Sequence, residues 1–224
     1  MRVIRNPDTS HHEDLLAMAG MKEDSLDLFV RTELVATDGD WSNPKLVVDE
    51  HQTPSWFDEI REAVEAEHLK YAASITITED RPTLIGGTWI VLGKVVIQRA
   101  SRCKLLVSKK ADLHIVANIS DTILFDDVYG TVTTGAVYGT VTTGAVSGTV
   151  TTGAVSGTGS VKTGAVYGTG SVKTGAVSGT VTTGAVSGTV TTGDVYVTVT
   201  TGDVYGTGSV KTGAVYGTGS VKKA

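Results

Sequence analysis

The chain of 224 residues contains few of the residues that build disulfides, membrane spans or large aromatic cores. It has one cysteine, four prolines and 6% aromatic residues. The single Cys103 cannot form an internal disulfide and is typical of a reducing compartment. Residues 1–20 hold no apolar run typical of a secretory signal peptide, and the apolar run at 89–96 is interrupted by Gly93 and Lys94. We therefore expect a cytoplasmic protein that is not secreted by a signal peptide and has no membrane segment.

Charge is distributed unevenly along the chain. The overall formal charge is −5; residues 128–224 carry five lysines and two aspartates, a balance of +3, which leaves −8 for residues 1–127. Nucleic-acid-binding proteins usually carry a basic stripe, and neither part of this chain is strongly basic. We expect no nucleic-acid partner.

The chain is rich in glycine, valine and threonine, which form ten tandem units after residue 127. The short unit has nine residues, Val-[Tyr/Ser]-Gly-Thr-Val-Thr-Thr-Gly-Ala. The long unit has eleven, Val-[Tyr/Ser]-Gly-Thr-Gly-Ser-Val-Lys-Thr-Gly-Ala. A fixed short period indicates a repeat architecture. The units begin at Val128, Val137, Val146, Val155, Val166, Val177, Val186, Val195, Val204 and Val215.

Each unit has the two-residue period of a β-strand. Val128, Gly130 and Val132 fall on one face, whereas Tyr129 and Thr131 fall on the other. The two additional residues of a long unit are expected to lengthen the strand without turning its faces over. The recurrent Thr-Gly before Ala or Asp is expected to make the turn, with a glycine free to take positive φ.

Two topologies fit these units. In a β-solenoid, two units make one coil of roughly 18 to 22 residues, and coils stack in parallel at about 4.8 Å. In a meander, consecutive units pair as antiparallel hairpins. We favour the solenoid because an inward face of valine and glycine suits a thin, two-layered interior, whereas a single-layered meander leaves one apolar face uncovered.

Residues 1–72 are expected to be mostly helical. Ser10 can cap a short helix that ends at Gly20, and a second helix is expected from Asp24 or Ser25 to Val30. Loop-forming residues occupy 36–44.

A firmer helix is expected over 53–70. Thr53 is its expected N-cap and Pro54 its first helical residue, the position at which proline is favoured. We expect this helix to cap the open end of the solenoid. Its apolar stripe comprises Trp56, Phe57, Ile60, Ala63 and Val64.

Residues 73–127 are expected to form irregular first coils of the same solenoid. The segment 74–78 alternates as a half-buried strand does, and short apolar runs follow at the spacing of short strands. These runs are bulkier than the later units and are expected to hold most of the core. They cover 84–85, 89–92, 95–97, 105–107, 113–116 and 119–125.

The layout resembles two groups of known proteins. A Thr-Pro-Ser-Trp-Phe-Asp helix start at 53–58, then an irregular β stretch and near-identical short repeats, is similar to repeat proteins encoded by phages of actinobacteria. That resemblance implies a phage origin and a role in the virion or against the host, with no known catalytic residues. The Val-x-Gly-x-Val cadence of 128–224 also resembles bactofilins, β-solenoids that polymerise end to end without nucleotide.

One repeat position is a candidate binding surface. Six of the seven tyrosines occupy it, and outward tyrosines offer large contact area with a polar tip. Stacking between strands is the alternative explanation. The lysines of the long units are expected to flank this row, where they meet an acidic partner or keep the sheet soluble. The candidate residues are Tyr129, Tyr138, Tyr167, Tyr196, Tyr205 and Tyr216, with Lys162, Lys173, Lys211 and Lys222.

Other chemistry is weaker in this sequence. Outward threonine ranks resemble ice-binding faces, but the long units interrupt them with serine and lysine. Calcium-binding nonapeptides need an aspartate in every unit, and only Asp194 and Asp203 occur. The cluster at 11–14 is explained by a helix start, His114 by a core or surface position, and Cys103 has no clear activating partner. An acyltransferase solenoid would keep a six-residue period that does not persist here.

The sequence thus predicts a mainly β protein, a β-solenoid with a small helical N-terminal cap. Its expected organisation is a helical region at 1–72, irregular coils at 73–127 and regular repeats at 128–224. We expect a non-enzymatic structural or interaction protein with no cofactor or metal. Its expected partners are proteins, either further copies in a homo-oligomer or components of a host or virion.

Overall fold

The structure, a computed structural model, divides the chain into two compact units, Met1–Thr76 and Ile77–Ala224. The residues that the structure describes are 12–21, 30, 32–48 and 54–223.

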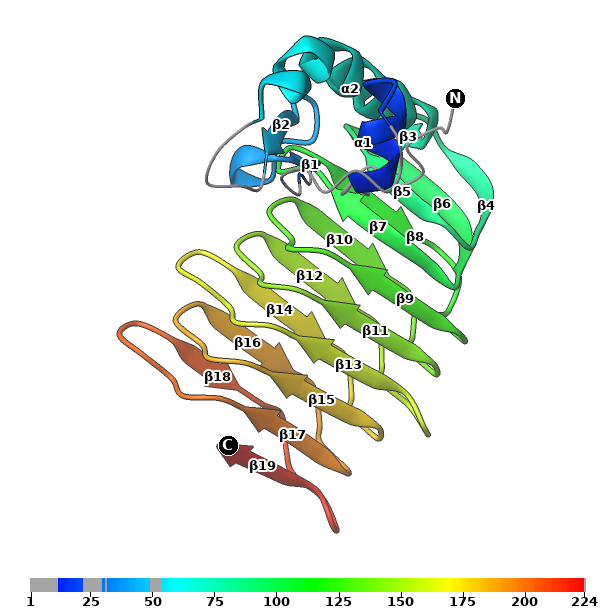
Figure 1. The fold of residues 1–224 in the computed structure, drawn as a ribbon. Coiled ribbons are helices and arrows are strands. Elements are labelled where there is room, and N and C mark those ends of the chain that lie inside the picture. Colours follow the sequence, from blue (N-terminus) through cyan, green and yellow to red (C-terminus); the bar gives the residue numbers. More distant parts are fainter. Residues whose placement is uncertain (1–11, 22–29, 31, 49–53, 224) are drawn as a thin grey trace. The chain divides into compact units, whose positions relative to one another are not determined.

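In its described residues, the first unit combines two α-helices with a β-hairpin (Figure 1). Helix α1 covers His12–Met18 and α2 covers Ser55–Ser74, while β1 (Thr32–Val35) pairs antiparallel with β2 (Lys45–Val48). A short 3-10 turn at Thr37–Gly39 lies in the loop between the strands, as the loop at 36–44 predicts. The expectation of a mostly helical region was incomplete. Both strands have only four residues, and neither Thr-Glu-Leu-Val nor Lys-Leu-Val-Val alternates apolar with polar residues, so the sequence gives little two-residue signal.

Helix α2 differs from its prediction at both ends. Pro54 is the N-cap residue, so the helix begins at Ser55 and not at Pro54. It continues to Ser74, four residues beyond the predicted end, and the predicted strand at 74–78 is reduced to β3 (Thr76–Ile77). Alanines 72 and 73 favour helix. The hydroxyl of Thr76 donates at 2.7 Å to the Ala72 carbonyl, which also accepts from the Ile75 N–H at the end of the helix.

The buried face of α2 is also shifted from the predicted stripe. Phe57 and Val64 are buried as expected, and they pack with Leu15 and Val30, whereas Ala63 is exposed. The face continues to His68, whose Nε2 lies 3.0 Å from the Thr32 hydroxyl. The predicted caps Ser10 and Thr53, and most of the predicted helix from Asp24 or Ser25 to Val30, lie outside the described residues.

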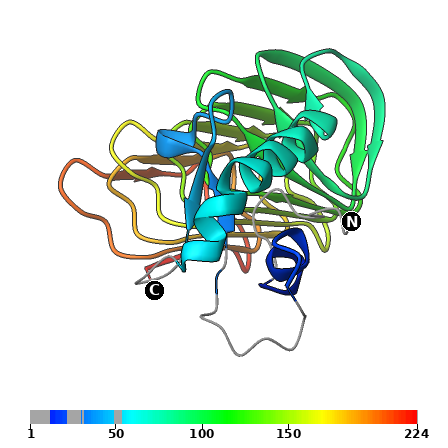
Figure 2. The same ribbon diagram turned by 45° about the horizontal axis from the view of Figure 1, so that its top comes forward.

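The second unit is a β-solenoid of about eight turns (Figure 1). Its strands form two parallel sheets, here named the even sheet and the odd sheet after the numbers of their strands, and Figure 2 shows the coils passing between them. The even sheet contains β4 (Arg81–Ile85), β6 (Lys94–Ser101), β8 (Asp112–Ile115), β10 (Thr131–Thr134), β12 (Thr149–Thr152), β14 (Ser171–Thr174), β16 (Thr189–Thr192) and β18 (Ser209–Lys211). The odd sheet contains β3, β5 (Thr88–Val91), β7 (Cys103–Val107), β9 (Thr122–Phe125), β11 (Thr140–Thr143), β13 (Ser160–Thr163), β15 (Thr180–Thr183), β17 (Thr198–Thr201) and β19 (Ser220–Lys223).

Two repeat units make one coil, as the solenoid reading predicts. Thr131 pairs in parallel with Thr149, and Thr149 pairs with Ser171, so consecutive strands of the even sheet come from alternate units. The valine that opens each unit forms a separate parallel bridge, for example Val128 with Val146. The antiparallel meander is therefore wrong. The apolar runs before residue 128 form coils of the same solenoid, as expected.

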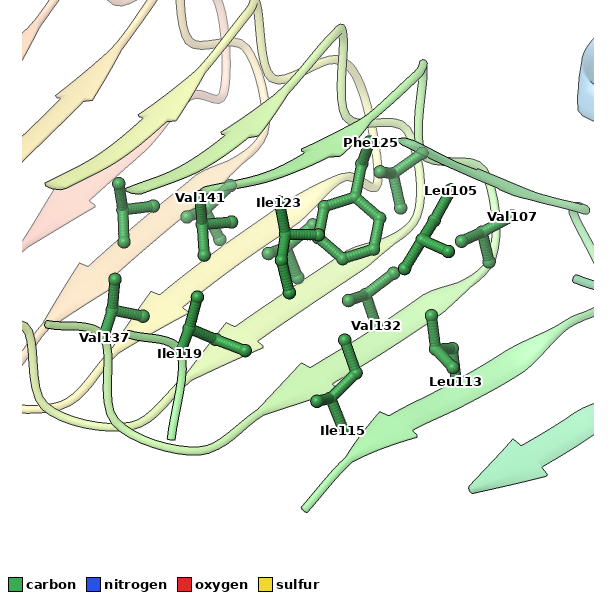
Figure 3. Close-up of a cluster of buried hydrophobic side chains, with 14 of the residues drawn as sticks. Leu105, Val107, Leu113, Ile115, Ile119, Ile123, Phe125, Val132, Val137 and Val141 are labelled. Atoms are coloured by element: carbon green, nitrogen blue, oxygen red, sulfur yellow. The ribbon is translucent and has the colours of Figure 1, made fainter. Parts of the chain in front are cut away.

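The core is one continuous column of apolar side chains between the sheets. Its first coils contain larger residues than the repeats, and Figure 3 shows Leu105, Ile115 and Phe125 pointing toward one another. In the repeats the inward positions are valine, with Val132 and Val141 fully buried. Each described unit up to residue 203 also buries the last threonine of its strand, a second inward position that the sequence reading did not assign. Five of these threonines donate to the carbonyl of the following glycine, at 3.0 to 3.2 Å: Thr134, Thr143, Thr152, Thr174 and Thr192.

Outside the turns of the long units, the repeated glycines serve close stacking of coils and not positive φ. The glycine of each Thr-Gly pair lacks positive φ, which corrects the sequence expectation. A Cβ on Gly153 would lie 2.8 Å from the amide nitrogen of Ala136 in the preceding coil. In the short units the third-position glycine is tighter still, because a Cβ on Gly148 would overlap the carbonyl oxygen of Gly130. Parallel coils at about 4.8 Å leave no room for a side chain there.

The two additional residues of a long unit do not lengthen its strand. Strand β13 of a long unit has four residues, the same as β11 of a short unit. The extra pair Gly157-Thr158 forms a turn closed by a 2.9 Å hydrogen bond from Gly159 N–H to the Ser156 carbonyl. Gly157 has a φ of +61° in this turn. The expectation of a longer strand was wrong, because a compact turn leaves the coil-to-coil register unchanged.

One repeat unit, which begins at Val195, lacks the glycine at its third position. Val197 replaces the third-position glycine, and its side chain is exposed. In the unit beginning at Val186, the Gly188 N–H donates to the Val166 carbonyl and the Thr189 N–H to the Gly170 carbonyl. Neither equivalent bond exists at Val197 and Thr198 within the described repeats. The valine at this position thus coincides with the loss of two backbone hydrogen bonds to the coil before it.

Candidate interaction surface

The repeat tyrosines point outward because they alternate with buried valines. Tyr129 lies between Val128, which is buried, and Gly130, which faces the preceding coil. All six are exposed by between 36% and 56%. Exposed aromatic side chains at one repeated position are a candidate protein-contact surface, because tyrosine is enriched at interaction hot spots. They are the most prominent chemical feature of the described solenoid surface.

The six tyrosines form two columns and not the single row expected. Each coil contains two repeat units, so equivalent residues of neighbouring coils are two units apart in the sequence. The tyrosine position of odd-numbered units therefore lies beside one sheet and that of even-numbered units beside the other. The Tyr129 column, beside the even sheet, contains Tyr129, Ser147, Tyr167, Ser187 and Tyr205. The Tyr138 column, beside the odd sheet, contains Tyr138, Ser156, Ser178, Tyr196 and Tyr216.

The two columns differ in their pattern. In the Tyr129 column tyrosine and serine alternate regularly. In the Tyr138 column Tyr196 and Tyr216 occupy neighbouring coils and stack, with ring centroids 5.2 Å apart and an interplanar angle of 16°. The alternative explanation of cross-strand stacking thus fits this pair, whereas a serine coil lies between successive tyrosines of the Tyr129 column.

Tyr205 also takes part in a polar cluster that the sequence reading missed. Its hydroxyl donates to Asp203 at 2.9 Å, and the Lys223 ammonium lies 2.9 Å from the other carboxylate oxygen. Hydrogen bonding by Lys223, and then by Tyr205, lowers the pKa of Asp203. The same contacts raise the pKa of Tyr205 and of Lys223. The signal in the sequence was an aspartate at the alanine position two residues before a tyrosine.

The long-unit lysines are divided between the sheets. Lys173 and Lys211 stand on the even sheet, in the same units as Tyr167 and Tyr205, while Lys162 and Lys222 stand on the odd sheet. The lysines occupy the third strand position, where short units have threonine. They interrupt the outward threonine ranks on both sheets, as the sequence indicates.

The other candidate residues have structural positions. His114 is exposed on β8, a surface position. Asp194 accepts a 2.9 Å hydrogen bond from the Ala214 N–H of the next coil, which gives it a structural role. The side chains of 11–14 lie outside the described residues. No group of three metal-binding side chains exists within the described part of the chain.

Cys103 provides a reporter of folding. It is buried on β7, and burial raises the pKa of its thiol to about 11. The folded state favours the protonated thiol because its pKa is raised from 9.0 to about 11. The contribution of Cys103 protonation to the free energy of unfolding is therefore present below pH 9 and is lost as the pH rises through about 11. At pH 8 we expect a disulfide reagent to label the native chain about 100-fold more slowly than the urea-unfolded chain, since the thiolate is the reactive form. Absorbance kinetics of labelling measure this, and equal rates would contradict a buried Cys103.

Neither α1 nor α2, the helices in the described part of the chain, has the length and apolar character needed to cross a bilayer. No protein-family model, curated protein or solved structure matches this chain.

Proposed function

We propose that the chain is a non-enzymatic structural protein whose solenoid presents a repeated tyrosine surface to a protein partner. The supporting observation is the exposure of all six repeat tyrosines on a regular backbone. Large, rigid aromatic side chains provide binding energy at low entropic cost, and they are enriched at interaction hot spots. The regular repeat presents the same contact several times, so weak contacts add by avidity.

The repeat layout supports a place for this surface in an assembly. Residues 128–176 and 177–224 are near copies, so the surface has been lengthened by duplication of complete units. Binding area grows with each added unit, whereas an enzyme site for one small substrate gains nothing from such lengthening. A phage-encoded virion component or host-directed binder, present as a homo-oligomer, fits this proposal.

Replacing all six tyrosines with serine tests the proposal. Serine already occupies the same position at Ser147, Ser156, Ser178 and Ser187, so the fold should remain intact. Circular dichroism and the denaturation midpoint check the fold. The immobilised wild-type chain should retain a specific protein from an actinobacterial lysate, and the six-serine variant should retain at least tenfold less. Equal capture by both chains would overturn the proposal.

A second measurement separates this proposal from a bactofilin-like filament. Sedimentation velocity at rising concentration should give a defined oligomer whose size is constant. Continuous growth in size with concentration would contradict a binder of fixed size.

A further inference from the structure

The Tyr129 column has a spacing that selects among extended ligands. Its tyrosines are separated by serine coils, so successive rings are two coils apart, or about 10 Å. Backbone hydrogen bonds fix this spacing: Tyr167 N–H donates to the Val146 carbonyl at 3.0 Å, and Tyr205 N–H donates to the Val186 carbonyl at 2.9 Å. Tyr167 and Tyr205 are the most exposed of the six, at 54% and 56%.

Two of the three coils that carry the tyrosines of this column also carry a lysine on the even sheet. Lys173 lies in the unit of Tyr167 and Lys211 in the unit of Tyr205, and the coil between them carries Thr191 at the equivalent position. Neither lysine forms a salt bridge with any described residue. The three tyrosine-bearing coils thus carry Thr133, Lys173 and Lys211 at this position, and the serine coils between them carry Thr151 and Thr191.

A ligand that lies along the Tyr129 column, and so crosses successive coils, must present the same face to the tyrosines about every 10 Å. A β-strand shows the same face every two residues, or about 6.7 Å, and its third residue points away. An α-helix shows it after about seven residues, or about 10.5 Å, with a rotational drift. A polyproline II segment has three residues per turn at about 3.1 Å each, so it shows the same face every 9.3 Å or so. Only the last combines the spacing with a constant face.

From this match we infer that the Tyr129 column binds a proline-rich segment of a partner protein in the polyproline II conformation. Aromatic side chains are the usual contact surface for such segments, whose preformed backbone loses little entropy on binding. Lys173 and Lys211 complement acidic residues that recur with the same three-residue period. The inference rests on the proposed function and names the partner class for one of the two columns.

The Tyr138 column is a matched control within the same chain. It offers the same number of tyrosines on the same backbone, but two of them stack on each other and two serine coils separate Tyr138 from Tyr196. A regular three-residue helix cannot meet its tyrosines in turn.

Fluorescence anisotropy with a labelled (Pro-Pro-Glu)5 peptide tests the inference on the full chain. Wild type should bind it at least tenfold more tightly than (Gly-Ser-Glu)5, which has the same charge and no polyproline II preference. The Tyr129→Ser, Tyr167→Ser double variant should lose about tenfold or more in affinity, whereas Tyr138→Ser, Tyr196→Ser should change it less than twofold. Tyr205 is left in place so that its bond to Asp203 is kept.

Charge is tested separately with Lys173→Thr and Lys211→Thr, which introduce the residue of the short units. Affinity should fall about threefold to tenfold, and its dependence on salt should weaken, because exposed charges are screened. Absence of peptide binding by wild type, or equal losses in the two tyrosine double variants, would overturn the inference. If the peptide fails while the six-serine variant still loses its captured protein, the proposed function stands and only the partner class is wrong.

Discussion

Replacing Gly148 with alanine is expected to be among the most destabilising single substitutions in the solenoid. The new Cβ would overlap the carbonyl oxygen of Gly130 in the preceding coil. The backbone must then move, and the bonds from Gly148 N–H to Val128 and from Thr149 N–H to Gly130, both 2.9 Å, are lost or weakened. Strain and lost hydrogen bonds together should lower the free energy of unfolding by about 2–4 kcal/mol, which a urea titration measures.

Two variants make this prediction specific. Ser147→Ala changes an outward residue next to Gly148 and should alter the free energy of unfolding by no more than about 0.5 kcal/mol. Val197→Gly reverses the defect found in the structure and should restore two hydrogen bonds, with a gain of about 1 kcal/mol. A Gly148→Ala chain as stable as wild type would show that the coils are not in the close contact described.

Deleting Thr149 alone should be more harmful than deleting two residues from a turn. Loss of Thr149 moves Val150, fully buried in β12, to an outward position and turns Thr151 inward. Exposing a valine and burying an unpaired hydroxyl should cost about 3–5 kcal/mol. The urea midpoint of the solenoid transition, followed by circular dichroism, measures the loss.

The matched control removes Gly157 and Thr158 together. This converts a long unit to the nine-residue form and removes only the turn that Gly159 closes on Ser156. The midpoint should stay close to that of wild type, because strand β13 and its pairing with β11 are untouched. If the two deletions shifted the midpoint equally, the alternation of inward and outward residues along the strands would not govern the stability of these coils.

The strand phase and the two-unit coil could be predicted from the sequence because they follow from valine and glycine spacing alone. The division of tyrosines into two columns was also available, since it depends only on whether a unit is odd or even in order. The sequence did not reveal why glycine is required at its repeated positions. That reason is the contact between Gly148 and Gly130, and it depends on the distance between coils, which no single unit encodes.

The hairpin of the first unit was missed for a different reason. Strands β1 and β2 have four residues each, and residues this few leave little periodic signal. The extension of α2 to Ser74 likewise depends on local hydrogen bonds, such as that from Thr76 to Ala72. Neither feature follows from hydrophobic pattern, which is why the boundaries were less accurate than the fold class.

The uniformity of the repeats has a consequence for how the chain finds its native register. Any unit of 128–224 can stack on almost any other, so slipped arrangements lie close in energy to the native one. The coils between Ile77 and Phe125 differ, because leucine, isoleucine and phenylalanine fill their interior with shapes that no other coil can match. We therefore expect these coils to fix the register of the repeats that stack on them, which the repeats alone would leave ambiguous.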